Sequence, residues 1–188
     1  MIRIVIGSVV AGLVQFIIGA IAWVSPLGAL AFNALDDTQT AQVQAALSSG
    51  LTATGTGTYF IPSPETAAGT EMLGRGPVAL IHFNTSGFPP MEPGALLTGL
   101  IMSIVTMLLV GIAVQRLPDF ASQMRVTALF AVATVFYFVF SLPVYNIYMP
   151  WAWWVFLGVQ EFLAFTVGAF VLLRFFMLRA AAPASGLN

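Results

Sequence analysis

The fold of this chain is decided by residues 151–173, which read WAWWVFLGVQEFLAFTVGAFVLL. The stretch contains a single charged side chain, Glu161, and begins with three tryptophans within four residues. A helix rises about 1.5 Å per residue, so a run of this length crosses a hydrocarbon core of about 30 Å. The stretch is therefore predicted to be a transmembrane helix.

Three further runs of the same kind precede it, at Ile4–Ser25, Gly94–Val114 and Val126–Ile147, and none contains a charged residue. The whole chain is 59% hydrophobic and 7% charged, whereas a soluble domain has about 25% charged residues. The sequence therefore predicts an all-α membrane protein, a bundle of four transmembrane helices.

The first run could be mistaken for a signal peptide, because Arg3 precedes it and Ala29-Leu30-Ala31 resembles a cleavage site. The run is longer than a signal core of about 7–15 residues, so we expect a retained helix. The expected segments are helix one (1–25), an inserted loop (26–93), helix two (94–114), a short loop (115–125), helix three (126–147), helix four (151–173) and a tail (174–188).

The arginines predict the orientation. The chain has no lysine, and five of its six basic residues lie close to helix ends: Arg3, Arg116, Arg125, Arg174 and Arg179. Because basic residues collect on the cytoplasmic side, both termini are expected in the cytoplasm and the inserted loop outside. The lysine-free composition, rich in alanine and glycine, is typical of a GC-rich bacterial genome and favours the bacterial cytoplasmic (inner) membrane.

The inserted loop is predicted to form a small α/β extracytoplasmic cap between helices one and two. Asp36 or Asp37 can cap a helix that runs through Ser49, and Gly50 can end it. Thr56–Pro62 and Pro77–Phe83 are rich in β-branched and aromatic residues and are expected to be strands. Such a cap is too small to hold a core of its own.

Tryptophans gather at the expected outer ends of the helices, where amphipathic rings prefer the headgroup region. They are Trp23, Trp151, Trp153 and Trp154. This belt acts either as an interface anchor or as an outer docking surface for a partner.

Small residues recur along the helices at heptad-like spacing, and the glycines among them are Gly12, Gly19, Gly158 and Gly168. Small side chains let helix backbones approach closely, which drives helix association in lipid. These glycines are therefore predicted to mark the helix contacts.

Three polar side chains are candidates for a function inside the membrane. Glu161 lies near mid-bilayer, where an ionised side chain costs at least about 3 kcal/mol. It shares a stripe with the small residues, so we expect it to face protein rather than lipid. Gln15 has a similar depth and is the expected hydrogen-bond partner, while Gln160 should point about 100° away. Glu161 has either a functional role or a structural one, as an inter-helix hydrogen bond.

Several chemistries lack the residues that they need. The chain has no cysteine, which excludes disulfides and thiol catalysis, and its single histidine, His82, makes a poor metal-ligand set. A net charge of −1 without a basic patch argues against a nucleic-acid partner. We therefore expect no catalytic residues, no metal and no cofactor.

The chain resembles small uncharacterised bacterial membrane proteins built as one helix, an outer insert and three further helices. The resemblance is carried by Trp23 at the end of helix one, by Thr58-Tyr59-Phe60-Ile61-Pro62, and by Pro90-Met91-Glu92-Pro93-Gly94. It implies an architecture and no activity.

Two functions remain open. The favoured one is a non-catalytic accessory or assembly subunit of a larger inner-membrane complex. The other is an oligomeric transporter or proton-coupled carrier that uses Glu161. Either function implies the lipid bilayer as solvent, and a protein partner or a second copy of the chain within the membrane.

Overall fold

The computed structural model describes residues 1–177 and divides into two compact units. The first unit contains Met1–Phe32 and the described chain from Pro93 onward, and the second is Asn33–Glu92. The expected tail beyond residue 177, with Arg179, lies outside the described residues.

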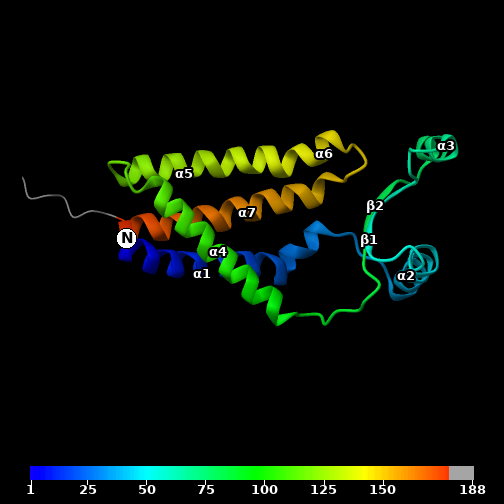
Figure 1. Ribbon diagram of the computed structural model, residues 1–188, viewed down its shortest axis with the longest axis horizontal. Coiled ribbons are helices and arrows are strands. Elements are labelled where there is room, and N and C mark those ends of the chain that lie inside the picture. The colour runs from blue at the N-terminus through cyan, green and yellow to red at the C-terminus, as the bar shows by residue number, and fades with distance from the viewer. Residues whose placement is uncertain (178–188) are drawn as a thin grey trace, which may run out of the picture. The chain divides into compact units, whose positions relative to one another are not determined.

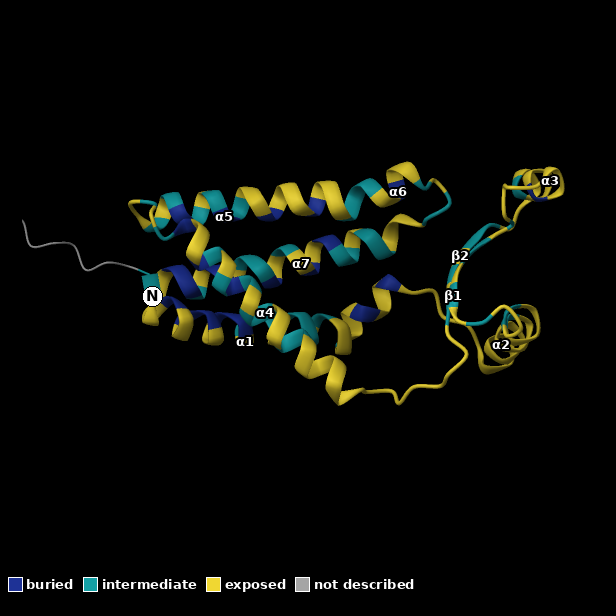
Figure 2. Cartoon of the chain, in the orientation of Figure 1, coloured by how far each residue is buried: buried dark blue, intermediate teal, exposed yellow. Residues whose placement is uncertain are grey.

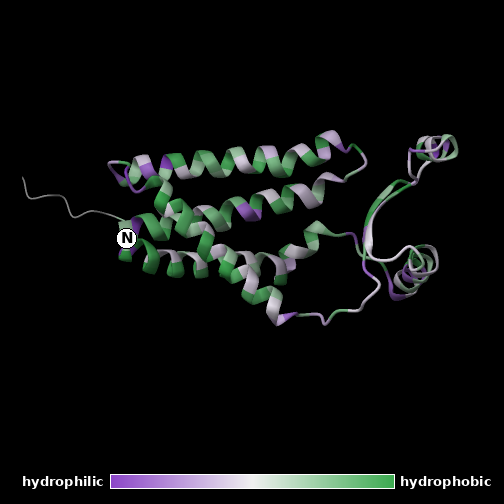
Figure 3. Ribbon diagram, in the orientation of Figure 1, coloured by the Kyte–Doolittle hydropathy of each residue, from purple (hydrophilic) through white to green (hydrophobic). Residues whose placement is uncertain are grey.

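The first unit contains four helices that are long and apolar enough to cross a membrane, which confirms that part of the prediction (Figure 3). Helix α1 spans Ile2–Val24 and α4 spans Pro93–Val114. The third begins as α5 (Phe120–Thr134) and continues through a π-helical stretch, η2 (Val135–Phe140), into α6 (Ser141–Tyr145). The fourth joins α7 (Trp151–Val171) to a second π-helical stretch, η3 (Leu172–Met177).

The third helix begins six residues earlier than the apolar run predicted, at Phe120 instead of residue 126. Asp119 is the reason, because its carboxylate accepts a hydrogen bond of 2.8 Å from the backbone N–H of Ser122. Such a cap satisfies an N–H that has no partner within the helix. Three polar residues of the predicted loop 115–125, Ser122, Gln123 and Arg125, therefore belong to the first turns of α5.

Three of the helices form a layer, with α7 packed between α1 on one side and α5 with η2 on the other. Figure 1 shows α4 crossing this layer diagonally, from the start of α5 to beyond α1. Most of the packing of α4 is against α1.

The helices converge at one end and spread apart at the other. Buried residues of α1 lie only in its first half, and those of α4 only in its second half (Figure 2). The centre of the packed end consists of Ala11, Met107, Ala169 and Leu172. The bundle is therefore closed where α1 begins and open where α1 ends.

A 3₁₀ turn, η1 (Pro26–Ala31), follows α1 within the same unit and packs against α1 and α7. Gly28 permits this fold-back, because a Cβ atom at that position would lie 2.4 Å from the carbonyl oxygen of Trp23. The turn thus covers one side of the open end.

The second unit consists of α2 (Asp37–Leu51), β1 (Gly57–Ile61), α3 (Ala67–Arg75) and β2 (Ala79–Phe83). The strands pair antiparallel, from Gly57 opposite Phe83 to Ile61 opposite Ala79. This confirms the predicted helix, which Asp36 caps, and both strands, whereas α3 was not predicted. The expectation that Gly50 ends the helix is wrong, because α2 continues through Gly50 to Leu51. Gly69 is the only buried residue of the unit, so the unit has no core of large side chains.

Candidate functional site

The polar candidates of α7 have the opposite exposure to the one predicted. Gln160 is buried, with 6% of its surface exposed, whereas Glu161 is exposed. The expectation that Glu161 faces the protein interior is therefore wrong for the single chain. The two side chains are joined by a hydrogen bond of 2.6 Å that Gln160 Nε2 donates to Glu161 Oε1.

The crossing of α4 explains this reversal. Residues seven apart lie on nearly the same face of a helix, so Glu161 is aligned with Gly168. A Cβ on Gly168 would lie 3.4 Å from the sulfur of Met107, so α4 covers this face at the depth of Gly168. Glu161 lies two turns nearer the beginning of α7 than Gly168, and at this depth the packed part of α4 has ended. Glu161 therefore lies on the side of the layer that α4 crosses, beyond the cover that α4 provides.

The predicted hydrogen bond between Glu161 and Gln15 is not formed, because Glu161 bonds to Gln160 instead. Gln15 packs elsewhere on α7, with its Cβ 3.0 Å from the place where a Cβ of Gly168 would lie. Gln160 faces α1 at Gly19, where a Cβ would lie 3.7 Å from Gln160 Oε1. The seam between α1 and α7 thus contains two glutamines, and each faces a glycine of the opposite helix.

Three buried side-chain oxygens have no hydrogen-bond partner among the described residues: Gln15 Oε1, Gln160 Oε1 and Thr166 Oγ1. A buried polar group without a partner costs roughly 1–3 kcal/mol on the scale of protein mutations. Such exceptions in a folded protein need an explanation. Two of the three belong to the glutamines of the α1–α7 seam.

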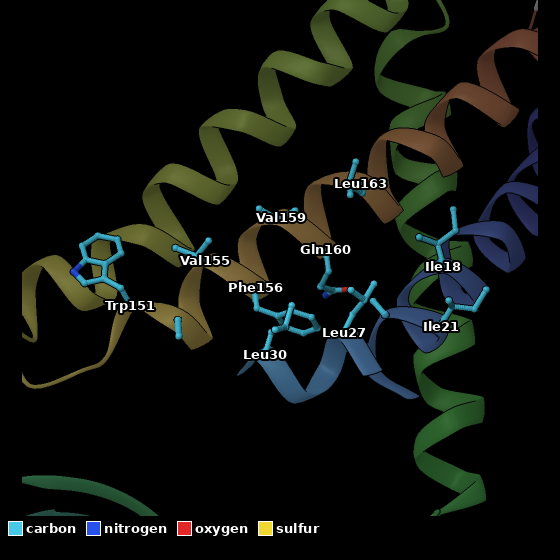
Figure 4. Close-up of a pocket in the computed structure, with 12 residues that line it drawn as sticks. Ile18, Ile21, Leu27, Leu30, Trp151, Val155, Phe156, Val159, Gln160 and Leu163 are labelled. Atoms are coloured by element: carbon cyan, nitrogen blue, oxygen red, sulfur yellow. The ribbon is translucent and has the colours of Figure 1, made fainter. Parts of the chain in front are cut away.

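An apolar groove of about 660 Å³ lies beside this seam, between α1, η1 and α7 (Figure 4). Ten of its twelve lining residues are aliphatic or Phe; the others are Gln160 and Trp151. This groove could not be predicted from the sequence, because η1 forms one of its walls and the fold-back at Gly28 was not predicted.

A second hollow of about 690 Å³ lies between α4 and α5, with Phe165 of α7 among its lining residues. Its polar groups are the hydroxyls of Thr106, Thr127 and Thr134. Phe165 is one helical turn from Glu161 on α7.

The tryptophans of the predicted belt are partly engaged in internal packing. The ring of Trp23 lies 5.3 Å from that of Trp153 and 4.9 Å from that of Phe156. Trp151 lines the groove, and Trp154 is half-buried. The rings of Trp23 and Trp153 thus join the end of α1 to the beginning of α7.

The four predicted packing glycines differ in how closely they are approached. A Cβ would lie 2.5 Å from Ile104 Cα at Gly12, 2.6 Å from the Phe140 ring at Gly158, and 3.0 Å from Gln15 Cβ at Gly168. Gly19 has more space. Two glycines that were not singled out, Gly7 and Gly111, are approached as closely, by Phe176 and Ile4.

His82 lies in the second unit, exposed on β2, with its Nδ1 3.0 Å from Thr58 Oγ1. Within residues 1–177, no three His, Asp or Glu side chains gather as a metal-binding group. The polar pair Gln160–Glu161, with the hollows beside it, is therefore the candidate site.

No family model, no curated protein and no solved structure matches the chain. The proposals below rest on the geometry and chemistry of the chain itself.

Proposed function

We propose that the chain is a non-catalytic accessory or assembly subunit of a larger complex in the bacterial cytoplasmic membrane. Both termini lie in the cytoplasm, and the unit Asn33–Glu92 lies outside. Support comes from the four helices of spanning length and from the arginines at one end of them, Arg3, Arg116, Arg125 and Arg174.

The exposure of Glu161 midway along α7 carries this proposal. A carboxylate at the centre of a bilayer costs about 2.5–3.5 kcal/mol on insertion scales. Among the described residues no ion pair involves Glu161, and the neighbour bonded to Glu161 is the neutral amide of Gln160. A partner protein that covers Glu161 and supplies a donor removes this cost.

The hollow between α4 and α5 has the features of a seat for a helix of that partner. It is lined by aliphatic and aromatic side chains together with three threonines, and small or hydroxyl-bearing residues favour helix contacts in lipid. Phe165, among its lining residues, is one helical turn from Glu161 on α7. A partner helix in this hollow can therefore bring a donor to the carboxylate.

Two substitutions of Glu161 test the proposal in cells that naturally express the chain. Glu161→Leu should release the chain from its complex, because it removes the hydrogen-bonding group, whereas Glu161→Gln should largely retain it. Val167→Leu, on an exposed position of the same helix, is the matched control and should leave the complex intact. The measurement is the size of the complex after extraction in a mild detergent.

The reference is the wild-type chain expressed alone. The proposal requires that the naturally expressed chain migrates in a larger assembly than this reference. Equal sizes in the two preparations would exclude an accessory subunit and favour the carrier. If the larger assembly forms but Glu161→Leu leaves it unchanged, the interface lies elsewhere.

A further inference from the structure

The groove between α1, η1 and α7 opens sideways, toward the surface of the first unit. Its rim on α7 is formed by Val155, Val159 and Leu163, of which about half of each is exposed, at 46%, 51% and 50%. Leu27 and Leu30 of η1 form the opposite rim. The volume of about 660 Å³ lies within the range of sites for small organic ligands. A molecule dissolved in the membrane can therefore enter from the side.

One wall of the groove contains an amide oxygen, Gln160 Oε1, that lacks a hydrogen-bond partner among the described residues. Gln160 is more than nine-tenths buried, and its side chain points from α7 into the space beside Leu27 (Figure 4). One N–H of Nε2 bonds to Glu161, while Oε1 has no donor among the described residues. The terminal torsion of a glutamine is broad, so rotation about it presents either the free N–H or, with release of the bond to Glu161, Oε1 to the groove.

The depth of Gln160 limits what the ligand can be. It lies nine residues from Trp151, or about 14 Å along the helix axis at 1.5 Å per residue. In a hydrocarbon core of about 30 Å this position is close to the middle. Phospholipids and sterols keep their polar groups at the interface, so they would place only hydrocarbon beside Gln160 and leave its amide without a partner.

We propose that the groove binds a prenylated quinone, with the ring beside Gln160 and the prenyl chain along the aliphatic lining. A quinone combines ring oxygens with an otherwise apolar body, and can therefore place a polar group at mid-bilayer. The amide N–H suits a quinone carbonyl, and Oε1 suits a quinol hydroxyl, so one side chain serves both forms. This binding is independent of the proposed partner helix, which occupies the hollow between α4 and α5.

The test is a titration of the purified chain in lipid nanodiscs with decylubiquinone, read as quenching of tryptophan fluorescence. Trp151 lines the groove and acts as the native reporter. We expect saturable quenching for the wild type. Gln160→Leu should weaken binding roughly three- to tenfold, the worth of one hydrogen bond inside a membrane. Ala152→Phe should also weaken it, because a phenyl ring would occupy part of the groove.

Gln115→Leu is the matched control, since Gln115 lies in the turn after α4, outside the groove, and should bind like the wild type. A second measurement needs no variant: decylbenzene, which lacks oxygens, should displace the quenching decylubiquinone with an affinity at least ten times weaker than that of decylubiquinone itself. Equal competition would show a site for hydrocarbon only and overturn the proposal. Quenching that never saturates, or that is identical in wild type and Gln160→Leu, would overturn it as well.

Discussion

At the scale of single residues, Gly12 is the glycine at which the backbones of two membrane-spanning helices approach most closely. A Cβ there would lie 2.5 Å from Ile104 Cα and 2.6 Å from Ile104 N, and backbone atoms cannot move aside as a side chain can. Gly12→Ala should therefore force α1 and α4 apart and lower the free energy of unfolding by about 1–3 kcal/mol. The measurement is unfolding in mixed micelles with an increasing fraction of SDS.

Gly19→Ala provides the control on the same helix. Its Cβ would meet only Gln160 Oε1, at 3.7 Å, which is an ordinary contact. Both substitutions carry the same gain in helix propensity, up to about 1 kcal/mol, so their difference isolates the contact with α4. Equal stability of the two variants would mean that α1 and α4 do not approach at Gly12.

The burial of Gln160 instead of Glu161 could not be predicted from the sequence. Glu161 lies within the arc of α7 that contains Gly158, Ala164 and Gly168, whereas Gln160 lies at its edge, so the pattern of small residues favours burial of Glu161. The choice depends on where α4 crosses, which is a property of the packing. The sequence did identify both residues as candidates, because each is a polar side chain in an apolar run.

At the scale of elements, Asp119 determines where α5 begins. The backbone N–H of Ser122, and then its hydroxyl, donate hydrogen bonds to the carboxylate and hold the pKa of Asp119 below its ordinary value of 3.8. Because the pKa of Asp119 is lower in the folded chain than in the unfolded chain, the stabilisation by this cap is complete above about pH 3.8. It is lost as the pH falls through the lower, folded value.

The comparison of wild type with Asp119→Asn tests this cap. Asparagine is also a good capping residue but does not ionise, so the variant should lose less stability than the wild type between pH 5 and pH 2. Thermal unfolding in detergent at a series of pH values measures the difference in stability between the two proteins. The other carboxylates are the same in both, so their contribution cancels in this difference. Parallel pH profiles would contradict the depressed pKa of Asp119.

Elements with a strong local signal were predictable, and those without one were not. Helix α2 was found because Asp36 or Asp37 can cap its start, and the strands because β-branched and aromatic residues follow one another between Gly and Pro. Helix α3 was missed because Ala67–Arg75 is short and includes two glycines. Its start depends on one bond, from the N–H of Gly69 to Thr66 Oγ1.

At the scale of the whole molecule, the open end of the first unit follows from where the tight contacts lie. Gly12 of α1 is approached by Ile104, near the middle of α4. Gly111, in the second half of α4, is approached by Ile4 of α1. Tight contact there and none near Pro93 lets α4 diverge from the layer. Apolar runs predict the number and length of the helices, but not this divergence, so neither the groove nor the exposure of Glu161 was visible in the sequence.

The orientation of the chain is the prediction that concerns the whole molecule, and single cysteines can test it because the native chain has none. Gly50→Cys suits the expected outer side, since nothing lies within 4 Å of its Cβ, whereas Thr66 caps α3 and should be avoided. Ala121→Cys suits the expected inner side, because it is exposed and leaves the bond between Ser122 and Asp119 intact. An impermeant maleimide should label residue 50 in intact cells, because the arginines keep the other helix ends in the cytoplasm. Residue 121 should be labelled only after lysis, and the opposite pattern would invert the proposed topology.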